Sequence, residues 1–187
     1  HNMEVLFPED ALKKLGEEGY EEVIVQPLHI IPGEEFDYIK HMVKEYEPCF
    51  KKIEIGRPIF HYEGFESGPD DYSYFVDTMK DLIEKNSPCV FVGHGSAHPS
   101  NAVYGCLQSV LIDKDYEDVF VGTVEGYPNF SNVLKKAKKK DIKEITIIPL
   151  MVVAGDHAKN DMASDEEDSW KSRFESEGIK ANVILKG

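Results

Sequence analysis

The chain has 187 residues, of which 41% are hydrophobic and 30% are charged, a composition typical of globular proteins. Its formal net charge of −14 at pH 7 argues against nucleic acid and anionic membranes as partners. No apolar stretch approaches the ~20 residues that span a bilayer, and no signal peptide is evident at the N-terminus. We therefore expect a cytoplasmic protein without membrane contact.

Apolar, strand-like runs alternate with amphipathic helical patterns along the whole chain. This alternation predicts an α/β fold, with parallel sheets and helices on both faces of each sheet. Ser164 and Glu167 stand at capping-box spacing and set the expected start of the last helix. In chain order, the predicted elements are helix 9–18, strand 22–28, helix 34–46, strand 52–56, helix 70–85, strand 89–93, helix 99–112, strand 118–124, helix 129–139, strand 143–151, helix 164–177 and strand 181–185.

A run of turn-forming residues, Asn86-Ser87-Pro88, predicts the boundary between two domains, residues 1–85 and residues 86–187, with the helix at 70–85 as the alternative connector. The three cysteines are widely spaced and form no CxxC pair, so neither a disulfide framework nor a zinc site is expected. We expect reduced thiols in or near the core at all three positions, Cys49, Cys89 and Cys106.

Each of the three strands predicted between residues 89 and 151 leads into a possible metal ligand. In chain order these ligands are His94, Glu125 and His157. Because the carboxyl ends of parallel strands line one crevice of an open α/β sheet, we expect the three side chains to converge there. Two imidazoles and one carboxylate suit Co²⁺, Ni²⁺, Fe²⁺ or Zn²⁺ better than Mg²⁺ or Ca²⁺. The same groups could instead serve as acid and base catalysts, since histidine titrates near neutral pH.

An internal repeat links the two parts of the chain. Residues 22–34 align without a gap to residues 144–156, with an offset of 122 residues between Glu22 and Glu144. At this offset His157 aligns with Glu35, so the complete ligand set belongs to the second copy alone. We infer a duplicated scaffold that carries its active groups on the second half.

The repeat also predicts a truncated first half. At the same offset, the counterpart of the strand at 89–93 would fall before residue 1. We therefore expect the first half to lack its opening strand and helix, and the strands at 22–28 and 52–56 to lose a neighbour between them. Unpaired strand edges and one apolar sheet face would then remain, which predicts self-association through the first half.

Three runs of sequence resemble the class II chelatases, and most closely the anaerobic cobalt chelatases that metallate sirohydrochlorin. They are GHGSAHPSN (93–101), VEGYP (124–128) and PLMVVAGDHAKNDMASDEEDSWKSRF (149–174). The resemblance extends over essentially the whole chain, with QPLHIIPGEEF (26–36) matching the family's first domain. The family's first strand, with its Gly-Thr-Ser turn, and its last helix have no match here. Their loss is expected to reduce ring binding.

The resemblance implies a chelatase-like fold of two flavodoxin-like halves, with the tetrapyrrole held in the cleft between them. It also implies insertion of Co²⁺ into sirohydrochlorin during cobalamin synthesis, without an organic cofactor. The metal ligands of the family fall on His94, Glu125 and His157. Among these, we expect His94 to be both a ligand and the acceptor of the pyrrole protons.

Four further residues are weaker candidates for contacts with the carboxylates of the substrate: His29, His98, Lys159 and Arg57. For His98 the alternative is a residue at the start of a helix. Two other functions stay open. The same fold could insert Fe²⁺ or Ni²⁺ into the same ring, or it could be a metal or tetrapyrrole carrier without turnover.

Overall fold

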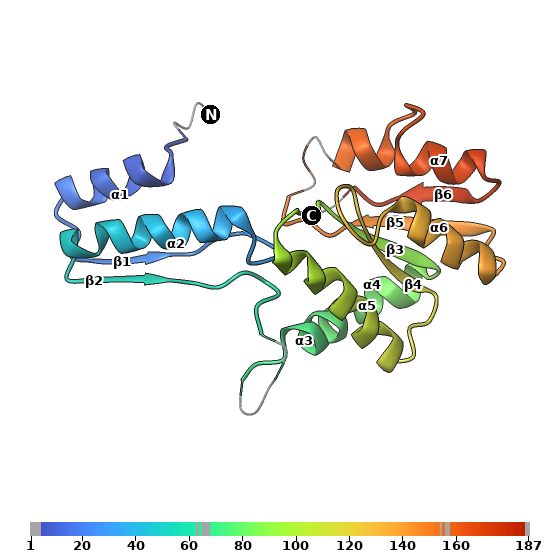
Figure 1. Cartoon of the computed structure of the whole chain (residues 1–187), viewed down its shortest axis with the longest axis horizontal. Helices are drawn as coiled ribbons and strands as arrows, with labels where there is room; N and C mark the ends of the chain where they lie inside the picture. The colour runs from blue at the N-terminus through green and yellow to red at the C-terminus, as the bar shows by residue number, and fades with distance from the viewer. Residues whose placement is uncertain (1–4, 63, 65–67, 154, 156–157, 186–187) are drawn as a thin grey trace. The chain divides into compact units, whose positions relative to one another are not determined.

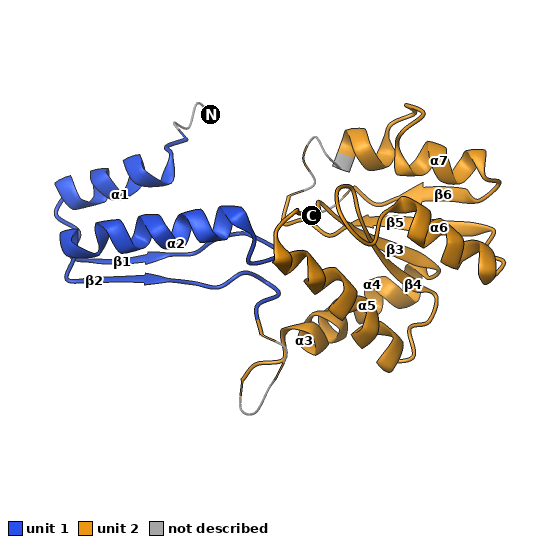
Figure 2. Ribbon diagram, viewed as in Figure 1, with its two compact units in different colours: residues 1–61 blue, residues 62–187 orange. Residues whose placement is uncertain are grey.

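The computed structural model describes residues 5–62, 64, 68–153, 155 and 158–185. The chain forms two compact units, residues 1–61 and residues 62–187 (Figure 2). Each unit contains a parallel sheet with helices packed against it, as the alternating pattern predicted. The elements of the first unit are α1 (Pro8–Glu17), β1 (Glu22–Val25), α2 (Glu34–Tyr46), the 3₁₀ turn η1 (Glu47–Cys49) and β2 (Lys52–Ile55).

The core of the first unit lies between its strands and its two long helices. Strands β1 and β2 pair in parallel, and alternate residues along each strand turn toward the helices. Figure 1 shows α1 and α2 on the same side of these strands. The residues that fill this core are Leu12, Met42 and Val43 from the helices, with Val23, Val25, Ile53 and Ile55 from the strands.

The other face of the first sheet differs from the prediction in two respects. Strands β1 and β2 hydrogen-bond to each other directly, so the expectation of a missing neighbour between them is wrong. The expected apolar face is also largely charged, because the exposed positions are Glu22, Ile24, Lys52 and Glu54. Lys52 and Glu54 form an ion pair of 3.0 Å there. Among these four side chains only Ile24, 75% exposed, is hydrophobic.

The second unit contains a four-stranded parallel sheet in the order β4-β3-β5-β6. Numbered from its own first strand, this order is 2-1-3-4, the flavodoxin-like arrangement. The elements of the unit are α3 (Asp71–Thr78), α4 (Lys80–Asn86), β3 (Cys89–Gly93), η2 (Pro99–Asn101), α5 (Ala102–Asp113), β4 (Val119–Thr123), α6 (Phe130–Lys139), β5 (Glu144–Pro149), the π-helical turn η3 (Ala158–Ala163), α7 (Trp170–Ser176) and β6 (Lys180–Val183).

Helices cover both faces of this second sheet, as Figure 1 shows. On one face α6 and α7 contribute Phe130, Trp170 and Phe174 to the core formed with the strands. On the other face the ring of Phe75 in α3 meets that of Phe91 in β3 edge-on, with centroids 5.7 Å apart. Strands β3 and β4 are buried along their whole length, which explains why they read as continuous apolar runs.

The boundary predicted between residues 85 and 86 differs from the division in the structure, which falls between residues 61 and 62. The region predicted as one helix at 70–85 forms α3 and α4, and both helices belong to the second compact unit. The contact of Phe75 with Phe91 and the 2.8 Å ion pair of Asp77 with Lys114 anchor α3 there. The turn-forming residues 86–88 therefore lead into β3 and lie within the second unit.

The last helix begins later than its capping-box pattern predicted. Helix α7 starts at Trp170, and the buried hydroxyl of Ser169 accepts the N–H of Ser172 at 3.1 Å. The hydroxyl of Ser164 instead donates to the carbonyl of Asn160 at 2.6 Å. The cap is therefore Ser169 rather than Ser164, and Trp170 in the first turn packs against the core ring of Phe130.

The internal repeat is present in three dimensions. Helices α1 and α6 begin and end at equivalent positions, 122 residues apart. The strand after each helix starts with a glutamate, and its parallel neighbour starts with a lysine: the register pairs are Glu22 with Lys52 and Glu144 with Lys180. In the second unit this pair forms a 2.9 Å ion pair, and the hydrogen bond from Lys180 lowers the pKa of Glu144.

The cysteines are all free, as predicted, but their environments differ. Cys89 is buried at the start of β3, and burial raises the pKa of its thiol to about 12. Cys106 is half-buried, whereas Cys49 is exposed. None of the helices in the described ranges combines the length and apolar character that crossing a membrane requires.

Candidate metal centre

His94 and Glu125 lie side by side at the carboxyl ends of two neighbouring strands. The ladder between β3 and β4 continues past the strands, because the N–H of Val124 donates to the carbonyl of Gly93 at 3.0 Å. The next bond joins the two candidate ligands themselves: the N–H of Glu125 donates to the carbonyl of His94 at 2.7 Å. Both residues are exposed. The backbone therefore places His94 and Glu125 next to each other at one edge of the sheet, at the strand ends where they were predicted.

The turn that carries His94 can form only because glycine follows it. Gly95 has a φ of +88°, in the region that side chains disfavour, and a Cβ atom there would lie 1.3 Å from the carbonyl oxygen of Glu125. Gly93 on the other side of His94 is equally constrained, since its Cβ would lie 2.3 Å from the ring of Tyr104. Gly95 lets the His94 turn pack directly on the loop that contains Glu125, and Gly93 lets it pack on Tyr104 of α5.

The ring of His94 also makes a local contact. Its Nδ1 lies 3.1 Å from the carbonyl oxygen of Gly95, so the tautomer with its proton on Nδ1 donates a hydrogen bond there. This tautomer places the lone pair on Nε2. A backbone carbonyl that orients the ring in this way is a common partner of metal-binding histidines.

The third predicted ligand, His157, lies outside the described residues, as does Asp156. The segment after β5 nevertheless starts beside β3, because the N–H of Leu150 donates to the carbonyl of Val92 at 2.8 Å. Among the residues that the structure describes, no group of three histidine, cysteine or acidic side chains forms a metal cluster. The convergence of His157 with His94 and Glu125 thus stays a prediction.

Two of the predicted substrate contacts belong to the second unit. His98 is the N-cap of η2: its Nδ1 accepts the N–H of Ser100 at 3.1 Å and lies 2.8 Å from the Ser100 hydroxyl. His98 therefore lies at the start of a 3₁₀ helix, which was the alternative to a substrate contact. Lys159 is exposed on η3, where its N–H donates to the carbonyl of Gly155 at 3.2 Å.

The other two predicted contacts belong to the first unit, just beyond the carboxyl ends of its strands. The chain after β1 and the chain after β2 stay paired, since the N–H of Ile59 donates to the carbonyl of His29 at 3.1 Å. His29 is half-buried, and its Nδ1 is buried without a hydrogen-bond partner in the described part of the chain. Arg57 is exposed, and its carbonyl accepts a 3.1 Å bond from Gln26.

Two residues that support the His94 turn were not predicted from the sequence. The hydroxyl of Tyr104 lies 3.4 Å from the N–H of Gly95, and the side chain of Asn101 bonds both to Ser96 and to Tyr127. Asn101 lies in the GHGSAHPSN run, and that was the only available signal. Its partner at position 127 could not be read from the sequence.

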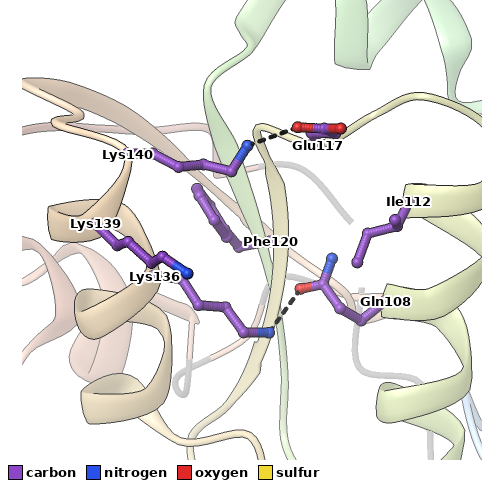
Figure 3. Close-up of a pocket in the computed structure, with 7 residues that line it drawn as sticks. All are labelled: Gln108, Ile112, Glu117, Phe120, Lys136, Lys139 and Lys140. Atoms are coloured by element: carbon purple, nitrogen blue, oxygen red, sulfur yellow. Dashed lines mark hydrogen bonds and ion pairs between the residues drawn. The ribbon is translucent and has the colours of Figure 1, made fainter.

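A separate cavity of about 280 Å³ lies near the amino end of β4 and holds none of the candidate ligands (Figure 3). Its volume is just below the roughly 300–1,000 Å³ typical of ligand sites. Gln108 protects the free edge of β4 there, donating to the carbonyl of Val119 at 2.9 Å and accepting the N–H of Val121 at 3.0 Å. The cavity is lined by Gln108, Ile112, Glu117, Phe120, Lys136, Lys139 and Lys140.

Comparison with known proteins agrees with this architecture. Two solved structures share the fold at 15% sequence identity. The first is the sirohydrochlorin chelatase SirB from Bacillus subtilis subspecies spizizenii in complex with cobalt, with a TM-score of 0.54 over 99% of this chain and 70% of that one. The second is CbiX, described as the terminal enzyme of siroheme biosynthesis in denitrifying bacteria, with a TM-score of 0.53 over 95% and 71%.

Comparison of sequences identifies the family of the chain. The chain is 36% identical over 183 residues to a sirohydrochlorin cobaltochelatase of Salmonella typhimurium, and 31% identical over 182 residues to sirohydrochlorin cobaltochelatase CbiKC of Nitratidesulfovibrio vulgaris. These matches cover 96% and 95% of this chain but only 67% and 62% of the two relatives. The family model described as cobalt chelatase (CbiK) matches residues 1–187. The chain therefore belongs to the cobalt chelatase (CbiK) family.

Proposed function

We propose that this protein inserts Co²⁺ into sirohydrochlorin, a step of anaerobic cobalamin synthesis. The observation that carries the proposal is the 2.7 Å bond from the Glu125 N–H to the His94 carbonyl. It joins the backbones of His94 and Glu125 at the carboxyl end of a flavodoxin-like sheet, in a chain of the cobalt chelatase family, and so supports a site to which both side chains contribute. In such sheets the ligand crevice lies at the switch point, here between β3 and β5.

The chemistry of insertion assigns a role to each proposed ligand. Co²⁺ is a substrate, and it must be held with one face open so that it can pass to the ring nitrogens. Three protein ligands, His94, Glu125 and His157, would leave such a face. Two pyrrole N–H protons leave the ring as the metal enters. Nε2 of His94 has a single lone pair, so it would accept a proton only once its bond to the metal has broken, and because His94 is exposed it can release that proton to water before it accepts the second. No organic cofactor is needed.

The ring carboxylates require local positive charge in a protein with a net charge of −14. Lys159 and Arg57 are the proposed cationic contacts, and both are exposed. His29 and His98 are the proposed neutral or protonated contacts. Nδ1 of His98 accepts the N–H of Ser100, so His98 would bind a carboxylate through its Nε2 atom.

Fe²⁺, Ni²⁺ and Zn²⁺ are alternative substrate metals, since a set of two histidines and one glutamate follows the general affinity order and the availability of each ion. A carrier of metal or tetrapyrrole is the alternative from another class. A carrier would bind Co²⁺ or the ring stoichiometrically and release no metallated product.

Two anaerobic measurements on the same preparation test the proposal. The first is the affinity for Co²⁺, Fe²⁺, Ni²⁺ and Zn²⁺ by calorimetry. The second is the rate at which each ion enters sirohydrochlorin, followed by the absorbance of the ring. We expect binding and multiple turnovers with Co²⁺. Binding of both Co²⁺ and sirohydrochlorin without turnover would favour the carrier, and absence of Co²⁺ binding would refute the metal centre.

We also predict self-association through the free edge of β1. In the second unit β5 has a strand on each side, whereas β1 pairs with β2 alone in the described part of the first unit. The outer N–H and C=O groups of β1, around the exposed Ile24, can template another strand. Light scattering after size exclusion should show a dimer that Ile24→Lys converts to monomer. A wild-type monomer at every concentration would contradict the prediction.

A further inference from the structure

We propose that Asn101 is a positioning residue that fixes the His94 loop against the Glu125 loop and thereby sets the affinity for Co²⁺. The inference rests on the proposed function, because it takes His94 and Glu125 as ligands of the substrate metal. Asn101 itself touches neither side chain in any contact that the structure gives, so its effect would act through the backbone.

The side chain of Asn101 bridges the two loops. Its Oδ1 accepts the N–H of Ser96, two residues after His94, at 3.1 Å. Its Nδ2 donates to the carbonyl of Tyr127, two residues after Glu125, at 2.6 Å. The first partner can only donate and the second can only accept, so the bridge requires one acceptor and one donor on the same short side chain. Of the residues of this length, only asparagine supplies both.

The surroundings of Asn101 leave little room for the bridge to move. Gly126 has a φ of +102°, and a Cβ atom there would lie 2.9 Å from Oδ1 of Asn101. Asn101 is the last residue of η2, and its own N–H donates to the carbonyl of His98 at 2.9 Å. The bridge therefore extends from the rigid start of α5 to both ligand loops, alongside the direct bond between Glu125 and His94.

Asn101→Asp separates the two halves of the bridge. The aspartate keeps an acceptor for the Ser96 N–H but puts an oxygen against the Tyr127 carbonyl, so the Glu125 loop loses its tie and is repelled. Because groups that orient metal ligands typically contribute 10–100-fold to affinity, we expect the Kd for Co²⁺ to rise about tenfold. The KM for Co²⁺ should rise more than kcat falls, while the KM for sirohydrochlorin should not change.

The direction in which the Kd for Co²⁺ changes distinguishes the loss of the bridge from an effect of the added negative charge. An added carboxylate near a bound cation would by itself tighten Co²⁺ binding. The matched control is Asn132→Asp, which adds the same charge at the start of α6 and keeps the acceptor for the N–H of Asn129. The bonds that the structure gives for Asn132 go to Asn129, at the end of the Glu125 loop, and the aspartate keeps the acceptor for that N–H, so this variant should bind Co²⁺ like the wild type.

The experiment compares four proteins by calorimetric titration with CoCl₂: wild type, Asn101→Asp, Asn132→Asp and His94→Ala. Asn101→Ala is a fifth variant that removes both bonds without adding charge, and it should also weaken binding. If His94→Ala abolishes binding while both Asn101 variants bind like wild type, the positioning role is overturned and the proposed function stands. If His94→Ala binds Co²⁺ normally, the proposed metal centre fails, and the positioning role fails with it.

Discussion

Replacement of His94 with alanine is expected to reduce the rate of Co²⁺ insertion at least about 100-fold, because general-base catalysis alone typically contributes that much. The variant loses a proposed ligand as well as the proposed proton acceptor, so its affinity for Co²⁺ should fall too. The measurement is the initial rate of metallation of sirohydrochlorin under anaerobic conditions, together with a titration of metal binding. His41→Ala is the control, since it removes an exposed imidazole from α2.

The other two ligands should behave differently from His94. Glu125→Ala and His157→Ala should mainly weaken retention of the metal, so excess Co²⁺ should restore part of their turnover. Excess Co²⁺ cannot replace a missing proton acceptor, and His94→Ala should therefore stay slow. Near-normal turnover by His94→Ala at low Co²⁺ would refute its double role.

Gly95→Ala is expected to be among the most damaging single-methyl substitutions in the chain. A left-handed backbone costs an L-residue roughly 1–2 kcal/mol, and the new Cβ would lie 1.3 Å from the carbonyl oxygen of Glu125. The turn and the Glu125 loop must separate to accept it. We expect a loss of at least about 3 kcal/mol in the free energy of unfolding, measured by urea denaturation, and a loss of Co²⁺ binding.

Gly105→Ala provides the matched control for this substitution. Gly105 lies inside α5, and a Cβ atom there would meet nothing within 4 Å. Alanine should therefore stabilise the chain by roughly 0.5–1 kcal/mol, as expected for a helix interior. Equal stability of the two variants would mean that the His94 turn does not pack on the Glu125 loop as described.

The sequence predicted those elements whose burial is uniform or strongly periodic. The strand at 89–93 and the helix at 34–46 have the predicted bounds, because one is buried throughout and the other has a clear apolar stripe. The helix predicted from Ser164 begins six residues later, at Trp170, where Ser169 is the cap and the Trp170 ring packs against Phe130. Capping spacing could not reveal this contact.

Strand order was harder to predict than strand position. The repeat aligned β1 with β5, but it did not show that β1 is hydrogen-bonded directly to β2, as β5 is to β6. The prediction of a further strand between β1 and β2 failed for this reason. Local sequence carries no signal for which strand lies beside which in a parallel sheet.

The candidate site was predictable where it depends on strand ends and not where it depends on loop contacts. His94 and Glu125 follow buried parallel strands, so their proximity follows from the fold. The bridge through Asn101 joins Ser96 to Tyr127, residues 31 positions apart in the sequence, and only the folded loops reveal it. The position of His157 stays a prediction from its place after β5.

The most direct test of the proposed metal centre is diffraction at the cobalt absorption edge from crystals grown with Co²⁺. We expect one strong anomalous peak at the carboxyl ends of β3 and β4. The nitrogens of His94 and His157 and a carboxylate oxygen of Glu125 should each lie ~2.0–2.2 Å from it, with one side open to solvent. A peak elsewhere on the chain, or one whose ligands exclude His94, would contradict it.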